Sequence, residues 1–250
     1  MMGVEPSLPQ PAKTVLTWFS APRDRGALHR ELGFPAEAPL VAVLARMHRS
    51  IHGVDLKGIR YFLDAARDVA QRVPDARFLV VGDGPLRAEL ERYALSLGLG
   101  QRVVFMGFRL DVPEILAEVA VAVSPSLAEA ISNSVIEAMA AGVPVVGTRV
   151  GGTPEAVEDG ETGILVPPRD AGALARSIVT LLEDRALASR LGLAGRRRIE
   201  TQFSTERMVR ATERLYASLI ERARRRQSVR WSRRWARRPG APAPRTISLP

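Results

Sequence analysis

Two carboxylates stand eight positions apart in one segment of the chain, which reads SPSLAEAISNSVIEAMAAGVPVV from residue 124. Glu129 ends a predicted loop, and Glu137 falls in the first turn or so of the helix that follows. Ser132, Asn133 and Ser134 lie between them at the expected helix start, where free backbone N–H groups and the helix dipole favour an anion. Carboxylates accept charge-assisted hydrogen bonds from paired hydroxyl groups. The segment therefore predicts a site for a diphosphate with a ribose and a hexose on either side.

Each of the two acids also has an interpretation that needs no ligand. Ser134-x-x-Glu137 has the spacing of a capping box, in which both side chains bind backbone N–H groups at a helix start. Glu129 alone is typical of a solvated loop carboxylate. The two acids together, with the further motifs described below, favour the ligand site.

Short β-branched segments that alternate with longer amphipathic ones must position these residues. Strands are predicted at 40–45, 76–82, 101–107, 120–126, 143–148 and 163–168. Helices are predicted at 23–32, 59–73, 86–97, 134–141, 171–183, 185–202 and 205–226. The alternation predicts an α/β fold, a Rossmann-like parallel sheet with helices on both faces and right-handed crossovers. Ligands of such sheets bind beyond the carboxyl ends of the strands, where the strand order reverses.

Composition places the basic residues at one end of the chain. The 250 residues are 46% hydrophobic, which is enough for a sizeable core, and they carry a net charge of +9. Ten arginines and no acid lie between Arg222 and Pro250, so the rest of the chain is close to neutral. We divide the sequence into a Pro-rich, linker-like segment at 1–39, a Rossmann-like domain at 40–204, a helix at 205–227 and a basic, disordered tail at 228–250.

Six motifs give the chain a family resemblance. They are Lys57-Gly58, VVGDGP at 80–85, VVFMGF at 103–108, SPSLAE at 124–129, EAMAAGVPVV at 137–146 and GGTPE at 151–155. In this order and approximate spacing they resemble the retaining glycosyltransferases of the GT-B fold, above all family 4 (glycosyl transferases group 1). The resemblance covers about residues 40–215. It implies the C-terminal, nucleotide-sugar-binding half of a GT-B fold, with the N-terminal acceptor-binding domain absent.

The same resemblance implies roles for single residues. Glu129 bonds hydroxyls of the donor sugar, Glu137 holds the ribose, and Arg46 and Lys57 clamp the diphosphate and stabilise the charge of the leaving group. The remaining positions expected to contact the nucleotide-sugar are Gly82, Gly84, Phe108, Arg109, Ser126, Ile131, Ser132, Asn133 and Ser134. The glycines have an alternative explanation as turn-formers, and isolated cations are most often solvated.

No metal and no other cofactor is expected. The sequence contains no D-x-D pair, and its three histidines have no metal-ligand spacing. Cationic side chains and a helix N-terminus would then neutralise the leaving diphosphate.

The chain also departs from the family pattern. Ala130-Ile131 replaces the usual Gly-Phe or Gly-Leu, and MHRSIHGVDL separates Arg46 from Lys57 by more than the usual distance. Without an acceptor domain, the alternatives to a glycosyltransferase are a binding module for nucleotide-sugar or a half-enzyme that needs an N-terminal domain on another chain. A sugar epimerase of the same fold is a third alternative.

The basic tail and the absence of cysteine bear on location. No apolar run of about 18 residues and no signal peptide occur, and a chain without cysteine suits a reducing cytoplasm. Arginines with Trp231 and Trp235 suit an anionic membrane surface or a nucleic acid, and a solvated tail is the simplest alternative. We expect a cytoplasmic protein, with the tail at 228–250 as a peripheral membrane contact and no nucleic-acid partner.

Overall fold

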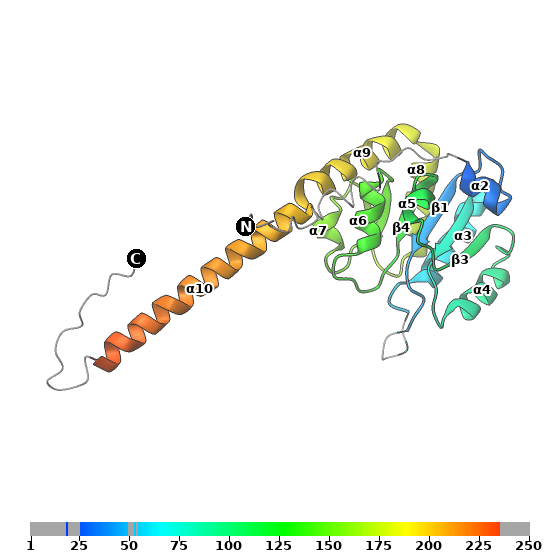
Figure 1. Cartoon of the computed structure of the whole chain (residues 1–250). Coiled ribbons are helices and arrows are strands. Elements are labelled where there is room, and N and C mark those ends of the chain that lie inside the picture. The colour runs from blue at the N-terminus through cyan, green and yellow to red at the C-terminus, as the bar shows by residue number, and fades with distance from the viewer. Residues whose placement is uncertain (1–18, 20–25, 50–52, 54, 236–250) are drawn as a thin grey trace, which may run out of the picture. The chain divides into compact units, whose positions relative to one another are not determined.

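The computed structural model describes residues 19, 26–49, 53 and 55–235, and its centre is one parallel sheet (Figure 1). The strand order is β3-β2-β1-β4-β5-β6, and each neighbouring pair is parallel. The strands are β1 (Leu40–Leu44), β2 (Arg77–Val81), β3 (Val103–Gly107), β4 (Val119–Ser124), β5 (Val145–Thr148) and β6 (Ile164–Val166). All six predicted strands are confirmed, and so is the Rossmann-like fold class.

Alternate residues of each strand enter different cores, because successive side chains point to opposite faces of a sheet. In β1, Val41 and Val43 belong to one core, whereas Leu40 and Ala42 belong to the other. The first core lies under α3 (Ile59–Arg72), α4 (Arg87–Ser96) and α8 (Ala171–Glu183). The second lies under α2 (Ala27–Leu32), α5 (Val112–Leu116) and α6 (Asn133–Ala140). Helices therefore cover both faces, as the alternation of segments predicts.

Two short helices and the end of the last one differ from the prediction. The sequence analysis missed α5. Thr153-Pro154 is typical of an N-cap followed by proline at the first helical position, but Thr153 is the first residue of α7 (Thr153–Ala156), whose N-cap is Gly152. The two helices α8 and α9 (Arg185–Gln202) have the predicted bounds. The last helix, α10, runs over Thr205–Trp235, so residues 228–235 are helical where disorder was expected. Arginine and glutamine favour a helix, and the next proline comes only at 239.

The chain divides into two compact units, Met1–Phe203 and Ser204–Pro250. The sheet and its helices belong to the first unit, and α10 belongs to the second. Residues 236–250 of the expected membrane-binding tail lie outside the described residues. None of the described helices combines the length and the apolar character needed to span a bilayer.

Residues 26–39, which we expected to be linker-like, pack on the sheet through a buried hydrogen-bond network. His29 Nδ1 lies 2.6 Å from Glu118 Oε2, and its Nε2 lies 2.9 Å from the carbonyl oxygen of Ala38. Glu118 also accepts the N–H groups of Leu28 and His29. Burial acts to raise the pKa of Glu118, but the hydrogen bonds from His29 and from these two N–H groups bring the pKa below its ordinary value. The network fixes α2 to the start of β4.

We expect Glu118→Gln to lower the free energy of unfolding by about 1–3 kcal/mol at neutral pH, because His29 loses a charged partner in a buried site. The native carboxyl has the lower pKa, so its contribution is present above the unfolded-state pKa and is lost as the pH falls through the native value. Urea titrations at several pH values check both effects. Equal stability of the variant and the wild type, with the same loss in acid, would contradict this role.

Candidate functional site

The strand order reverses between β1 and β4, and the candidate residues cluster at the carboxyl ends of these two strands. The chain runs from β1 outward through β2 to β3, and from β4 outward through β5 to β6. The loops that leave β1 and β4 therefore diverge and open a crevice, which is the usual ligand site of such sheets. Arg46 and Lys57 follow β1, whereas Ser126 and Glu129 follow β4.

Backbone contacts hold these two loops together. The N–H of Leu127 donates to the carbonyl oxygen of Leu56 at 2.8 Å. Gly58 has φ +66°, and a Cβ atom at this position would lie 2.0 Å from the carbonyl oxygen of Pro125. Any larger residue would push the loops apart, so close contact between the loops explains why the Lys57-Gly58 motif has a glycine at position 58.

An ion pair between side chains also joins the two loops. Lys57 Nζ lies 2.5 Å from Glu129 Oε2, with the two side chains 25% and 13% exposed. Asp55 positions the lysine, because its carboxylate accepts the N–H groups of Lys57, Gly58 and Ile59 at the start of α3. The sequence analysis missed Asp55, although an aspartate just before an apolar helical segment is a capping signal. The structure thus brings together two residues that are 72 positions apart.

Ser126 contacts Glu129 from inside the protein. Its side chain is buried, and its Oγ donates to Glu129 Oε2 at 3.3 Å. Its carbonyl oxygen accepts the Thr148 hydroxyl at 2.5 Å. We expected Ser126 to contact the ligand, and in the structure its hydroxyl binds the Glu129 carboxylate. Thr148 was also missed, and nothing in its sequence surroundings marks it.

The N-terminus of α6 faces this crevice without a side-chain cap. Its N-cap is Ser132, and the Oγ atoms of Ser132 and Ser134 bind each other at 2.9 Å instead of the backbone. The interpretation of Ser134 and Glu137 as a capping box is therefore wrong, because the helix begins at Asn133 and Glu137 lies in its second turn. No side chain among the described residues caps the helix, so the N–H groups of its first turn are available to an anion.

Glu137 is half-buried and has no hydrogen-bond or ion-pair partner within the described part of the chain. Burial alone raises the pKa of this carboxyl above its ordinary value. A carboxylate that is withdrawn from water without a partner costs stability. Such a residue is a candidate for ligand binding, since hydroxyl donors of a ligand would supply the missing bonds.

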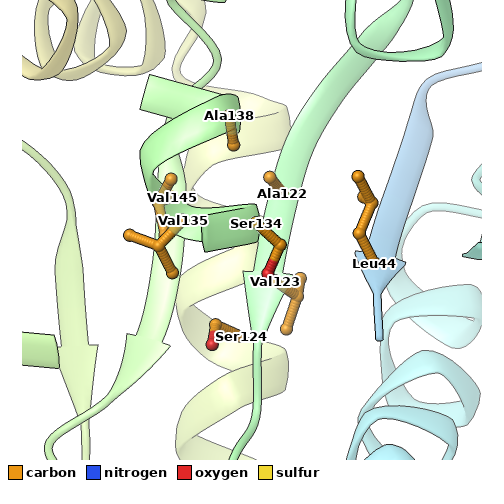
Figure 2. A pocket seen from close by; sticks show the side chains of 8 residues that line it. All are labelled: Leu44, Ala122, Val123, Ser124, Ser134, Val135, Ala138 and Val145. Carbon is orange, nitrogen blue, oxygen red and sulfur yellow. The ribbon is translucent and has the colours of Figure 1, made fainter. Parts of the chain in front are cut away.

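A small hollow adjoins this helix N-terminus (Figure 2). It is lined by Leu44, Ala122, Val123, Ser124, Ser134, Val135, Ala138 and Val145. Leu44 belongs to β1 and Ser124 to β4, while Ser134 belongs to α6, so the hollow lies at the reversal of strand order. Its walls are mainly apolar, with two serine hydroxyls as its polar groups.

The expected base-binding residues lie along the same edge of the sheet. A Cβ atom on Gly82 or Gly84 would lie within 2.2 Å of the carbonyl oxygen of Ala45 or Met47, so contact with the β1 loop accounts for both glycines. Phe108 follows β3, two strands from β1, and is 75% exposed.

Arg109 and Arg46 differ in how their guanidinium groups are held. Hydrogen bonds from Arg109 to Asp111 and Glu31 raise the pKa of this arginine and lower the pKa of both acids. Its side chain is therefore engaged, and only its backbone remains for a base. Arg46 is exposed, and its side chain makes no recorded bond to any described residue.

Within the described ranges, no three histidine, aspartate or glutamate side chains gather in a group that could hold a metal ion.

Comparison with known proteins gives a family match that includes all six strands of the sheet. The model of the glycosyl transferases group 1 family matches residues 38–184. The lipopolysaccharide core biosynthesis glycosyltransferase LpsE of Rhizobium meliloti is 35% identical over 188 residues, which are 75% of this chain and 52% of LpsE. A GDP-mannose-dependent phosphatidylinositol monomannoside mannosyltransferase of Mycolicibacterium smegmatis is 34% identical over 71% of this chain and 47% of its own length.

A solved structure agrees with the sequence relatives. HepE from Anabaena, crystallised in complex with UDP-glucose, is 28% identical and superposes with a TM-score of 0.73. The match covers 81% of this chain and 55% of HepE. The chain thus spans about half the length of the relatives that it matches.

Proposed function

Because the chain belongs to the glycosyl transferases group 1 family, we propose that it binds a nucleoside diphosphate sugar and forms the donor half of a retaining glycosyltransferase. The observation that carries the proposal is the Lys57–Glu129 pair at the reversal of strand order, beside the uncapped N-terminus of α6. The cation and the free N–H groups suit the diphosphate of such a ligand, and the carboxylate suits the hydroxyl groups of its sugar.

In the proposed complex, the diphosphate lies at the N–H groups of Asn133, Ser134 and Val135 in the first turn of α6. Lys57 turns from Glu129 to the phosphate oxygens, and Arg46, which is exposed on the same loop, joins it. Glu129 then accepts hydroxyls of the hexose, while Glu137 accepts the two ribose hydroxyls. Each group that lacks a partner in the free protein gains one of opposite or complementary character.

The transfer step needs stabilisation of negative charge more than it needs a base. The bond between the anomeric carbon and the diphosphate oxygen breaks, an acceptor hydroxyl forms the new bond to that carbon, and its proton leaves. The diphosphate gains charge as the bond breaks, and Lys57, Arg46 and the helix N-terminus stabilise it. We propose that no metal is required, since these groups supply the positive charge. The acceptor must be held by another domain.

A thermal-shift screen with UDP-, GDP- and ADP-sugars tests the proposal. UDP-glucose is bound in HepE, and GDP-mannose is named for the mycobacterial relative, so both belong in the screen. One nucleotide-sugar at 100 times its Kd should stabilise the protein by about 2.7 kcal/mol. This raises Tm by roughly 5–10 °C for a unit of this size, and added EDTA should not change the shift. The free hexose is the control, and a screen in which no nucleotide-sugar raises Tm would contradict the proposal.

A further inference from the structure

The hydroxyl of Thr148 extends the contact between β4 and β5 beyond the end of their ladder. The last paired residues of the two strands are Ser124 and Gly147. Thr148 follows, is 4% exposed, and places its Oγ1 2.5 Å from the carbonyl oxygen of Ser126 and 3.3 Å from that of Ser124. A side chain thus holds the turn that leaves β4, at a point where strand pairing has ended.

Two glycines after β5 contact Glu129 and Ala130, which lie further along the loop that follows β4. The N–H of Gly152 lies 3.3 Å from the carbonyl oxygen of Glu129. A Cβ atom on Gly151 would lie 1.7 Å from that oxygen, and one on Gly152 would lie 2.2 Å from the carbonyl oxygen of Ala130. A side chain at either position would displace the facing loop, because the backbone at 151–152 lies directly against the backbone at 129–130.

We propose that Thr148, Gly151 and Gly152 form a brace that positions the Glu129 carboxylate for the sugar of the donor. The brace reaches Glu129 at two places, through the Ser126 carbonyl and hydroxyl and through the Glu129 carbonyl itself. The inference rests on the proposed function, in which Glu129 binds the hexose. These three residues are positioning residues, because they act on the ligand only through Glu129.

The brace predicts an effect on one part of the ligand only. Among its recorded bonds, none involves Glu137 or the first turn of α6, which are proposed to hold the ribose and the diphosphate. Loss of the brace should therefore weaken the contribution of the sugar to binding and leave the affinity for the nucleoside diphosphate unchanged. A general loss of stability would instead weaken both.

Calorimetric titrations of Thr148→Val with UDP, UDP-glucose, GDP and GDP-mannose test this prediction. Valine keeps the shape of threonine and removes the hydroxyl. We expect the ratio of nucleotide-sugar affinity to nucleoside-diphosphate affinity to fall about tenfold. This corresponds to the loss of one hydrogen bond between the Glu129 carboxylate and a sugar hydroxyl. Thr148→Ser, which restores the hydroxyl, should recover the ratio. An unchanged ratio in Thr148→Val, or an equal loss for both ligands, would overturn the brace.

Gly152→Ala is a second variant that disturbs the brace, because its methyl group must displace the backbone at Ala130. Gly152 has φ −83°, so alanine meets the loop at Ala130 without a strained φ. Gly172→Ala is the matched control, because a Cβ atom there meets nothing closer than a flexible arginine side chain at 3.3 Å. The first variant should lower the same ratio, and the control should not. A wild-type protein that binds none of UDP, GDP and ADP would refute the proposed function itself, which is a different result from binding with an unchanged ratio.

Discussion

Glu137→Gln is expected to lower the affinity for a nucleoside diphosphate about 100-fold or more. Each hydrogen bond to a charged group contributes about 1.5–3 kcal/mol, and a carboxylate that accepts both ribose hydroxyls makes two of them. Glutamine keeps the shape of the side chain but carries no charge and offers one acceptor oxygen instead of two. Isothermal titration calorimetry with UDP and GDP, which carry no hexose, measures this loss of affinity directly.

The same variant should be more stable than the wild type when no ligand is present. Burial raises the pKa of Glu137, so the native protein releases this proton at higher pH than the unfolded chain does. Stability therefore falls as the pH rises through the interval between the two pKa values, and it stays lower above that interval. Glu137→Gln removes this loss, so its Tm should exceed that of the wild type at neutral pH.

Glu183→Gln provides the matched control, because it removes one negative charge at an exposed position at the end of α8. It should change neither nucleotide affinity nor Tm measurably. A Glu137→Gln protein that binds nucleotide as tightly as the control would show that this carboxylate does not hold the ribose.

Lys57→Gln is the second change with a large expected effect. One charge-assisted bond to the diphosphate is lost, which should weaken binding of UDP or GDP about 10- to 100-fold. The change also leaves Glu129, which is 13% exposed, without its cation, so stability should fall by about 1–3 kcal/mol. Adding Glu129→Gln to this variant should restore much of the stability but not the affinity for the diphosphate. Recovery of that affinity would mean that Lys57 acts only through Glu129.

Lysine chemistry makes the movement of this side chain observable. Lys13 and Lys57 are the only lysines in the sequence, and every other basic residue is an arginine or a histidine. Reductive methylation with ¹³C-formaldehyde therefore labels these two side chains and the terminal amine, and a Lys57→Arg sample identifies the Lys57 signal. We expect this signal to shift on addition of UDP or GDP, as the ammonium group leaves Glu129 for the phosphate. A signal unmoved at saturating nucleotide would refute the proposed exchange of partners.

Much of the fold could be predicted because each strand is short, β-branched and bounded by glycine, proline or polar residues. Helices with clear end signals were also predictable, such as α8, where Asp170 accepts the N–H of Ala173. The five-residue α5 and the extent of the four-residue α7 were not, because helices so short have little periodicity and depend on tertiary packing.

The candidate site could be predicted by residue type, but its contacts could not. The spacing of Glu129 and Glu137 marks the β4–α6 segment, yet nothing local indicates that Lys57 pairs with Glu129 across the switch between β1 and β4. The capping box failed because Ser132 and Ser134 both suit an N-cap, and the extended backbone at Ser132 decides between them. Thr148 acts through a hydroxyl bond to a loop 22 residues away, which no sequence pattern indicates.

The most direct test of the central claim is the amide spectrum of the ¹⁵N-labelled protein during titration with UDP and GDP. If a diphosphate lies at the N-terminus of α6, the N–H groups of Asn133, Ser134 and Val135 must donate to it, and their resonances should move together along one saturation curve. Saturable binding that leaves these three resonances in place, while amides elsewhere move, would contradict the account.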